Sequence, residues 1–441
     1  MIDFSEFGLE VPEILLPKEK KIDSWSVIAC DQYTQDLDYW HNVEKSAASF
    51  PSTLNLILPE VYLSSPDRKE RIEKIRNTMK SYLKDGIFDS EQKEFIYIER
   101  KTSYGRIRKG LLAAIDLDSY EWKPFSKALI RATEATIVDR IPPRMEIRRG
   151  AALESPHIML LVNDSEKVLV EKAGQLVKNN IPLYDGDLML NSGHITGWAV
   201  GDEKSLSQIY SSLKLLKEKN TAADGSSFMF AVGDGNHSLA TAKAVWDEYK
   251  NELKSKGVSE KQISECPVRY ALVEIVNIYD EGLTFEPIHR VLFNADIFKC
   301  AEFVQKNLGG NISVLDDEKS LEEKVKSSKS SFGFVSTVEG NVKYLLLETP
   351  VTQLAVSCLQ PVLDKFISEN KNIEIDYIHG SDEVFRLAKK ENALTIMLPP
   401  VAKDSFFSTI NLNGPLPRKS FSMGESSEKR FYLECRKLFE V

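Results

Sequence analysis

FMFAVGDGNHSLATAKAVWDEY, residues 228–249, predicts the element around which the rest of the chain is organised. Five apolar residues lead without a charge into Gly233, Asp234, Gly235 and Asn236, and apolar residues then recur at helical spacing. This pattern predicts a buried strand, a tight turn and a helix. Glycine tolerates positive φ, so the two glycines allow successive backbone N–H groups to point into one concavity at the start of the helix.

Such a helix start attracts phosphate, because its unpaired N–H groups and the helix dipole both favour negative charge. Asn236, His237 and Ser238 add an amide, an imidazole and a hydroxyl to the backbone of Gly233 and Gly235. An acid in the same turn, Asp234, would repel a bare phosphate. It therefore indicates either a metal ion between the two or a proton-accepting role. The alternative interpretation is an ordinary Asn or Asp cap that opens a helix after a buried strand.

Composition narrows the class of protein. The chain has 441 residues, of which 42% are hydrophobic and 28% charged, and its net charge is −9. An acidic balance argues against nonspecific binding to nucleic acid and to anionic membranes, and leaves small-molecule or nucleotide ligands open. The five scattered cysteines indicate neither a disulfide framework nor a zinc site. We expect a cytoplasmic protein without a membrane span, and the oligomeric state stays open.

Strand and helix patterns follow one another along the whole chain. Strand meanders, such as FIYIERKT followed by RKGLLAAIDLDSYEW, occur together with strand–helix units. We therefore expect an α+β protein with mixed sheets flanked by helices. Soft boundaries divide it into an N-terminal α+β region (1–225), the region of the central motif (226–295) and a C-terminal α+β region (296–441), although the three can form one continuous unit.

Two further segments are candidates for the same site. Asp31 follows the apolar strand candidate SVIAC and is either a base or a helix cap. Residues 131–149 hold five arginines against three acids, a local basic excess that begins at Arg131. Arginine forks suit phosphate and carboxylate groups, so this segment either faces a ligand or forms a solvated strand-and-loop surface.

His157 and a set of three residues near position 190 receive structural interpretations. His157 stands at the entrance of the predicted strand PHIMLLVND and is interpreted as a packing residue. Asp185, Asp187 and His194 contain metal-ligating atoms, but their spacing is not that of a metal site, and turn residues are the favoured interpretation.

Several stretches together resemble the family catalogued as domain of unknown function 1015, of the ParB/sulfiredoxin-like superfamily. The resemblance rests on five motifs in this order: IACDQYT, RATEAT followed by DRIPPR, GDGNHSLATA, PIHRVLF and LPRKSFSMG. Relatives usually have Asp-Gly-His-His-Arg where this chain has Asp-Gly-Asn-His-Ser at 234–238. Lys243 or Arg131 would then take the place of the missing arginine.

The resemblance implies a nucleotide site, since superfamily members with this turn include free-serine kinases, sulfiredoxins and CTP-binding segregation proteins. We expect a phosphotransferase that uses Mg²⁺ and a nucleoside di- or triphosphate to phosphorylate a small-molecule hydroxyl. Asp234 would hold the metal or accept the proton, His237 would bind phosphate, and Asp31 is a second base. Cations from Arg131, Arg290 and Lys243 would neutralise charge. A non-catalytic nucleotide or metabolite sensor and a phosphate-ester hydrolase are the alternatives.

Overall fold

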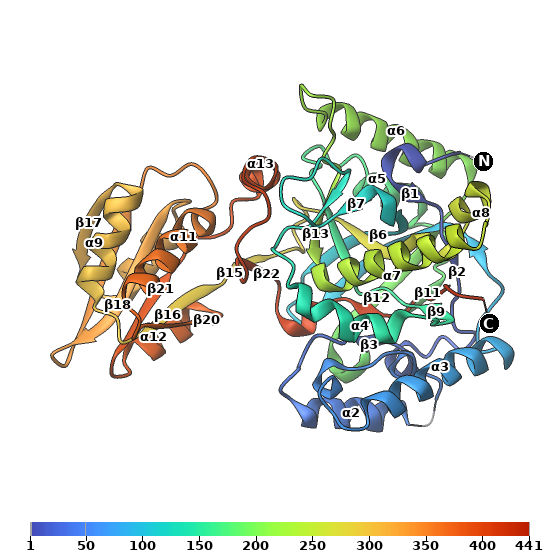
Figure 1. Cartoon of the computed structure of the whole chain (residues 1–441), viewed down its shortest axis with the longest axis horizontal. Coiled ribbons are helices and arrows are strands. Elements are labelled where there is room, and N and C mark those ends of the chain that lie inside the picture. Colours follow the sequence, from blue (N-terminus) through green and yellow to red (C-terminus); the bar gives the residue numbers. More distant parts are fainter. Residues whose placement is uncertain (1, 49, 441) are drawn as a thin grey trace. The chain divides into compact units, whose positions relative to one another are not determined.

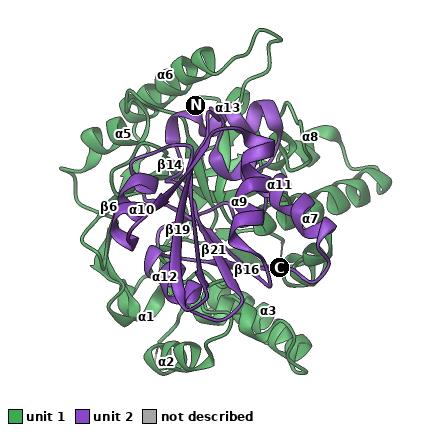
Figure 2. Ribbon diagram, turned by 90° about the vertical axis from the view of Figure 1, so that its left-hand side faces the viewer, with its two compact units in different colours: residues 1–283, 425–441 green, residues 284–424 purple. Residues whose placement is uncertain are grey.

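The chain divides into two compact units. The computed structural model describes residues 2–48 and 50–440. Unit 1 comprises 1–283 and 425–441, and unit 2 comprises 284–424 (Figure 2). Both combine sheets with helices, which confirms the α+β class expected from the sequence (Figure 1). The domain boundaries expected near 225 and 295 stay a prediction. The two compact units are defined in a different way, by the contacts between residues.

A mixed ten-stranded sheet forms the centre of unit 1. Strand β10 pairs in parallel with β14, and β8 pairs in parallel with β13 and β7, while the other neighbours are antiparallel. In spatial order the strands are β11 (Tyr184–Asp187), β12 (Gly193–Val200), β5 (Phe95–Thr102), β6 (Ile107–Asp116), β14 (Tyr270–Asn277), β10 (Met159–Val162), β13 (Phe230–Asp234), β8 (Ile130–Arg131) and β7 (Tyr120–Glu121), and β1 (Leu9–Glu10) also pairs with β6.

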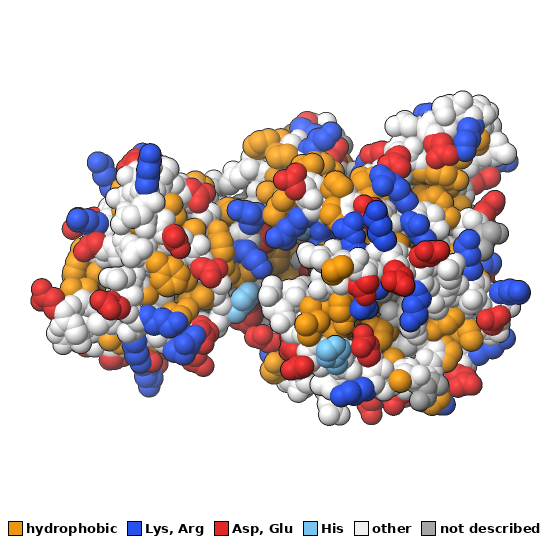
Figure 3. Space-filling model, turned by 60° about the horizontal axis from the view of Figure 1, so that its bottom comes forward, with side chains coloured by type: hydrophobic (Ala, Val, Ile, Leu, Met, Phe, Trp, Pro, Cys, Tyr) orange, Lys and Arg blue, Asp and Glu red, His pale blue; other side chains and the backbone are white. Residues whose placement is uncertain are grey.

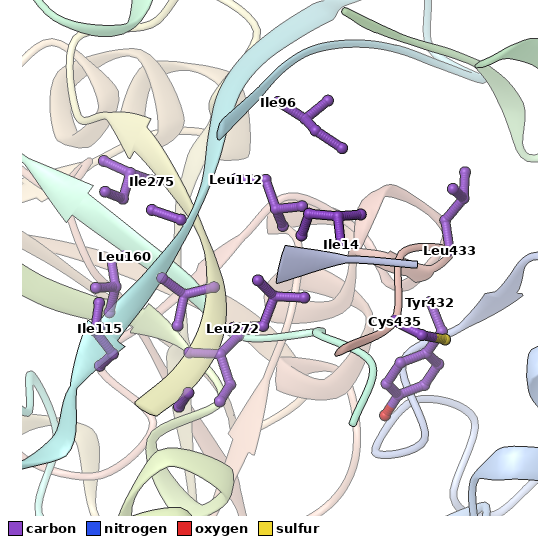
Figure 4. Close-up of a cluster of buried hydrophobic side chains, with 14 of the residues drawn as sticks. Ile14, Ile96, Leu112, Ile115, Leu160, Leu272, Ile275, Tyr432, Leu433 and Cys435 are labelled. Carbon is purple, nitrogen blue, oxygen red and sulfur yellow. The ribbon is translucent and has the colours of Figure 1, made fainter. Parts of the chain in front are cut away.

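Helices surround this sheet. Helix α5 packs on the strands, α6 packs on α5, and α4 lies along α7. The helices of unit 1 are α1 (Ile22–Trp25), α2 (Leu37–Ala47), α3 (Arg68–Lys84), α4 (Ile141–Arg148), α5 (Val170–Val177), α6 (Glu203–Lys219), α7 (Asn236–Ser255) and α8 (Glu260–Ser264). Aliphatic side chains from distant strands meet in one core, and Tyr432 lies at its edge with its hydroxyl directed away from them (Figure 4).

The last residues of the chain return to unit 1 and pair with its early segments. The indole of Trp25 donates to the carbonyl of Leu433 at 2.8 Å, and the amide of Leu15 donates to the carbonyl of Cys435 at 2.8 Å. Two short strands of this segment pair with earlier strands: β23 (Phe431–Tyr432) with β3 (Val27–Ile28), and β24 (Arg436–Lys437) with β9 (Leu153–Glu154). A further two-stranded pair joins β2 (Glu13–Ile14) with β4 (Gln92–Lys93).

The returning segment also places charged groups inside unit 1. Arg430 is 1% exposed, and its guanidinium lies 3.1 Å from Glu274 and 2.8 Å from Glu434. Arg108 contacts the other oxygen of Glu274 at 3.4 Å. Burial disfavours the charge of Arg430, but Glu434 and Glu274 together raise its pKa. This buried ionic network links strands β6 and β14 to the C-terminal segment.

Unit 2 is built on a six-stranded antiparallel sheet. Alternate residues of its strands face two cores: Phe334 packs toward α9 and α11, and Val335 toward α10 and α12. The strands in order are β17 (Asn311–Leu315), β19 (Asn341–Glu348), β18 (Ser331–Val338), β21 (Ala393–Met397), β16 (His289–Phe293) and β20 (Glu374–Ile378), with β15 (Phe285–Pro287) and β22 (Phe421–Met423) as a separate pair. The helices are α9 (Ile297–Leu308), α10 (Glu318–Lys326), α11 (Ala355–Glu369), α12 (Ser381–Ala388) and α13 (Lys403–Asn413).

Candidate functional site

The predicted strand, turn and helix are present in unit 1. Strand β13 ends at Asp234, Gly235 occupies the N-cap position, and α7 begins at Asn236. Gly235 has φ 81°, in the left-handed region that was expected for it, whereas Gly233 lies in the strand and has no positive φ. The first backbone N–H groups of α7 lack acceptors within the helix, as at every helix start. The motif therefore presents the N-terminus of a 20-residue helix beside polar side chains.

Gly235→Val should destabilise unit 1 by about 1 to 3 kcal/mol, because a residue with a Cβ is strained at this φ. A Cβ at this position would also lie 3.0 Å from Ile158 Cγ1 and 3.3 Å from Ile158 Cα. Gly225→Val is the matched control, since Gly225 has φ 82° but no atom within 4 Å of the added Cβ. Urea unfolding measures both variants. Equal losses would show that contact with Ile158 contributes nothing.

Asn236 connects the helix start to the segment that follows β8. Its side-chain oxygen accepts from the amide of Thr133 at 3.2 Å, and its side-chain nitrogen donates to the hydroxyl of Thr133 at 3.2 Å. That hydroxyl in turn donates to the carbonyl of Val232 at 2.6 Å. These bonds hold the RATEAT segment against the end of β13. The side chain of Asn236 thus has a positioning role in addition to any contact with phosphate.

Asp234 has a cationic partner that the sequence analysis missed. One oxygen accepts from the amide of Gly235 at 3.0 Å, and the other lies 3.4 Å from the ammonium of Lys429. Lys429 is itself buried and belongs to the segment that returns from unit 2. No local pattern in the sequence pairs this lysine with Asp234. Lys429 places a positive charge beside the acid at the start of α7.

His237 is held as a neutral imidazole. Burial and the nearby Arg144 and Arg140 lower its pKa to about 4, and Asp31 opposes this shift. Its Nε2 accepts from the amide of Ile137 at 3.3 Å. In a neutral ring the hydrogen then resides on Nδ1, which is left as a donor for an anionic group. The residue can therefore bind phosphate by a neutral hydrogen bond.

This pKa predicts how His237 affects stability. Between pH 6.5 and 4 the unfolded chain binds a proton at this residue and the folded protein does not, so stability falls as pH decreases through that range. His237→Asn should make the decrease shallower, whereas His41→Asn, at an exposed position of α2, should leave it unchanged. Urea unfolding at several pH values tests this difference. An unchanged slope in His237→Asn would contradict the lowered pKa.

Asp31 and the arginines of α4 lie near His237. The negative charge of Asp31 raises the pKa of the imidazole, and the charges of Arg140 and Arg144 lower it. Asp31 follows β3 in a turn and accepts from the side chain of Gln32 at 3.0 Å. The second half of the basic segment 131–149 forms the short helix α4, which packs along α7, and its first half is strand, loop and a 3-10 turn. The two prolines of α4 occupy the first helical turn, a position that favours them.

The other predicted cations make contacts of their own. Arg131 donates to the carbonyl of Ala128 at 2.8 Å and lies over the ring of Phe228. Lys243 is 2.8 Å from Asp247 and 3.6 Å from Asp118. Their roles as phosphate ligands stay predictions.

Arg290 belongs to unit 2. It is fully buried there and donates to the side chain of Gln360 at 2.7 Å and to the carbonyl of Ile288 at 2.6 Å. Its predicted role in charge neutralisation stays untested. The cations whose charge acts on His237 are Arg140 and Arg144.

On the face of unit 1 drawn in Figure 3, Lys and Arg side chains gather in a band, although the chain is acidic overall.

The three residues interpreted as turn residues form a local cluster. His194 lies between two carboxylates, with Nδ1 2.7 Å from Asp187 and Nε2 2.9 Å from Asp185. Burial opposes protonation of His194, but hydrogen bonds to both carboxylates raise its pKa. Among residues 2–48 and 50–440, no group of three or more His, Cys, Asp or Glu side chains has the arrangement of a metal site.

Comparisons with known proteins place the chain. The family described as "Protein of unknown function (DUF1015)" matches residues 12–366. The chain belongs to this family. No curated protein matches this DUF1015 protein. In the part of the chain that the structure describes, none of the helices has both the length and the apolar character needed to cross a membrane.

Solved structures with a similar chain course include a free serine kinase variant in complex with AMP, with 12% identity, 74% of this chain and 92% of that chain covered, and a TM-score of 0.38. A conserved hypothetical protein from Pyrococcus furiosus has 12% identity, coverages of 74% and 94%, and a TM-score of 0.35. SbnI with a C-terminal truncation from Staphylococcus aureus has 7% identity, coverages of 71% and 82%, and a TM-score of 0.34. At such scores the likeness carries no argument about the site of this DUF1015 protein.

Proposed function

We propose that unit 1 binds a nucleoside di- or triphosphate at the start of α7 and transfers a phosphoryl group to a small-molecule hydroxyl. The observation that carries this proposal is the positive φ of Gly235 at the start of α7, together with a neutral His237 whose pKa is lowered by burial and by two nearby arginines. Helix N-termini of this kind bind phosphate through backbone N–H groups and the helix dipole. Membership of the ParB/sulfiredoxin-like superfamily is part of the same proposal.

Each residue has a distinct part in this reaction. The backbone of Gly235 and Ser238 and the Nδ1–H of His237 would hold phosphate oxygens, and Arg140 would neutralise negative charge. Asp31 would accept the proton of the attacking hydroxyl, because it is the acid whose negative charge reaches the imidazole of His237 and opposes the effect of the two arginines on its pKa. Lys429 would orient the carboxylate of Asp234 beside the turn.

The residues of this site fit Mg²⁺ only as an ion shared with the ligand. Mg²⁺ is commonly held by one or two carboxylates together with substrate phosphates. Asp234 and Asp31 are the carboxylates that this region supplies, which agrees with the lack of a three-residue metal cluster in the described chain. When bound, the ion would neutralise charge on the phosphates. Nothing else in the assignment of residues depends on it.

A thermal-shift panel of nucleoside mono-, di- and triphosphates, with and without Mg²⁺, tests the proposal. A nucleotide at 100 times its dissociation constant should add roughly 2.7 kcal/mol to the stability of the folded state. Release of ADP from ATP, or of AMP from ADP, that depends on an added alcohol or sugar supports a phosphotransferase, whereas the same release with water alone identifies a hydrolase. Binding without turnover would identify a sensor. No stabilisation by any nucleotide would reject the site.

His237→Ala should weaken nucleotide binding by about 1 to 3 kcal/mol, the range for a hydrogen bond to a charged group, with little change in fold. Isothermal titration with the best nucleotide of the panel measures the loss. His41→Ala is the matched control, because His41 is exposed on α2 in the same unit. If His237→Ala binds as tightly as the parent, or loses its fold, the assignment of this residue fails.

A further inference from the structure

A pocket of about 150 Å³ lies in unit 1 beside the first turns of α7. About half of its lining residues are aliphatic or methionine, and the others are polar or charged and include His157, Ser238 and Tyr432. An apolar cavity with a few convergent polar groups is the usual form of a small-molecule site. The volume equals that of cavities that accept benzene, so the ligand has a compact body of roughly six to ten non-hydrogen atoms. The aliphatic walls include Leu56, Leu58, Leu63, Met79, Ile147 and Leu153.

A directed chain of hydrogen bonds reaches the pocket at Ser238. The amide of Cys30 donates to the hydroxyl oxygen of Tyr432 at 3.1 Å. Burial raises the pKa of Tyr432 well above its usual value, so the phenol keeps its hydrogen. Nδ1 of His157 lies 3.1 Å from this hydroxyl, and we assign it as the acceptor of that hydrogen. The imidazole hydrogen therefore sits on Nε2, which donates to the hydroxyl oxygen of Ser238 at 2.9 Å.

This order of donors fixes what Ser238 can offer. Its oxygen already accepts from His157, so its own hydrogen is available for donation. A ligand oxygen in the pocket, from a hydroxyl or a carbonyl, is the matching acceptor. The order also argues against Ser238 as a nucleophile, because Nε2 of His157 carries a hydrogen and cannot remove another.

The charged residues around the pocket compensate one another. The guanidinium of Arg144 lies 2.8 Å from Glu60, and that of Arg148 lies 2.6 Å from Glu154. Each of these four residues lines the pocket. A charged ligand would therefore have to compete with an existing ion pair, whereas an uncharged ligand would not. The walls, the volume and the paired charges favour an uncharged molecule.

We propose that this pocket binds a small uncharged molecule with an apolar body and one hydroxyl or carbonyl oxygen seated on Ser238. Because Ser238 follows His237 directly, the ligand would lie at the same helix end as the phosphate group of the proposed function. Its assignment as the phosphoryl acceptor rests on that proposed function, but its binding does not. The binding test uses no nucleotide, so failure of the pocket and failure of the phosphate site are distinguishable.

The experiment compares three probes of similar shape with the full chain: cyclohexanol, methylcyclohexane and cyclohexanecarboxylate. Saturation-transfer NMR and titration should show that cyclohexanol binds most tightly. Ser238→Ala should weaken cyclohexanol by about 3- to 10-fold, the effect of one hydrogen bond, and leave methylcyclohexane unchanged. Ala151→Phe should abolish binding of both, because Ala151 is buried in the pocket wall. If circular dichroism shows that Ala151→Phe does not fold, Ala151→Leu is used in its place.

Three results would overturn the proposal. Unchanged cyclohexanol binding in a folded Ala151 variant would place the probe elsewhere. Tighter binding of the carboxylate than of the alcohol would make the pocket an anion site. Hydrolysis of p-nitrophenyl acetate by the parent but not by Ser238→Ala would reverse the hydrogen-bond order and make Ser238 a nucleophile.

Discussion

Arg430→Ala is expected to destabilise the protein by about 3 to 5 kcal/mol, the usual effect of removing one partner from a buried ion pair. The side chain of Arg430 is 1% exposed and lies between Glu274 and Glu434, which are 1% and 0% exposed. Its loss would leave two carboxylates buried near each other with only Arg108 beside Glu274. Their mutual repulsion and the cost of burying unpaired charge act in the same direction.

Urea unfolding of the full chain measures this loss. Arg149→Ala is the matched control, since the Arg149–Glu248 pair is 44% and 52% exposed and such surface pairs contribute little. We expect the control to stay within about 0.5 kcal/mol of the parent. A similar effect in both variants would show that the buried network adds no more than a surface ion pair.

The second large effect concerns the two acids of the candidate site. Asp31→Asn and Asp234→Asn should each reduce phosphoryl transfer by about 10²- to 10⁴-fold, the range for loss of a general base or an equivalent group. The double variant should be at most a few-fold slower than the slower single variant, because the effects of residues that act as one catalytic unit are not additive. ADP release from Mg²⁺–ATP, with the acceptor panel described above, is the measurement.

Asp38→Asn provides the control for this pair, because Asp38 is an exposed acid in the first turn of α2. It should leave ADP release unchanged. If the effects of the two single variants multiply in the double variant, Asp31 and Asp234 act independently and do not form one catalytic site. If neither single variant changes the rate, Asp31 is only a turn residue and Asp234 is only the ion-pair partner of Lys429.

The sequence predicted those elements whose signal is local. An uninterrupted apolar run, two glycines and a helical repeat predicted β13, the turn at Gly235 and α7, and the structure confirms all three. The hairpin of β5 and β6 was predicted in the same way. Helix α4 was missed, although paired prolines at a helix start are a known signal.

Contacts between distant segments could not be predicted, because no local pattern encodes them. Lys429 lies 3.4 Å from Asp234 although the two residues are 195 positions apart in the sequence (429 − 234). The two-residue strands β9, β23 and β24 are too short to show any periodicity, whereas β3 lies within the predicted strand SVIAC. Arg131 was singled out because arginines cluster near it, but the charges that act on His237 come from the helix that begins ten residues later.

The return of residues 425–440 to unit 1 has a consequence for synthesis on the ribosome. Strands β3 and β9 emerge early, but their partners β23 and β24 follow only after all of unit 2. At about 5 to 20 residues per second, translation of unit 2 takes on the order of ten seconds. Throughout that interval the nascent chain already holds the start of α7, while Asp234 has no Lys429 and Glu274 has no Arg430. Lys429 and Arg430 therefore reach Asp234 and Glu274 only after unit 2 has been translated.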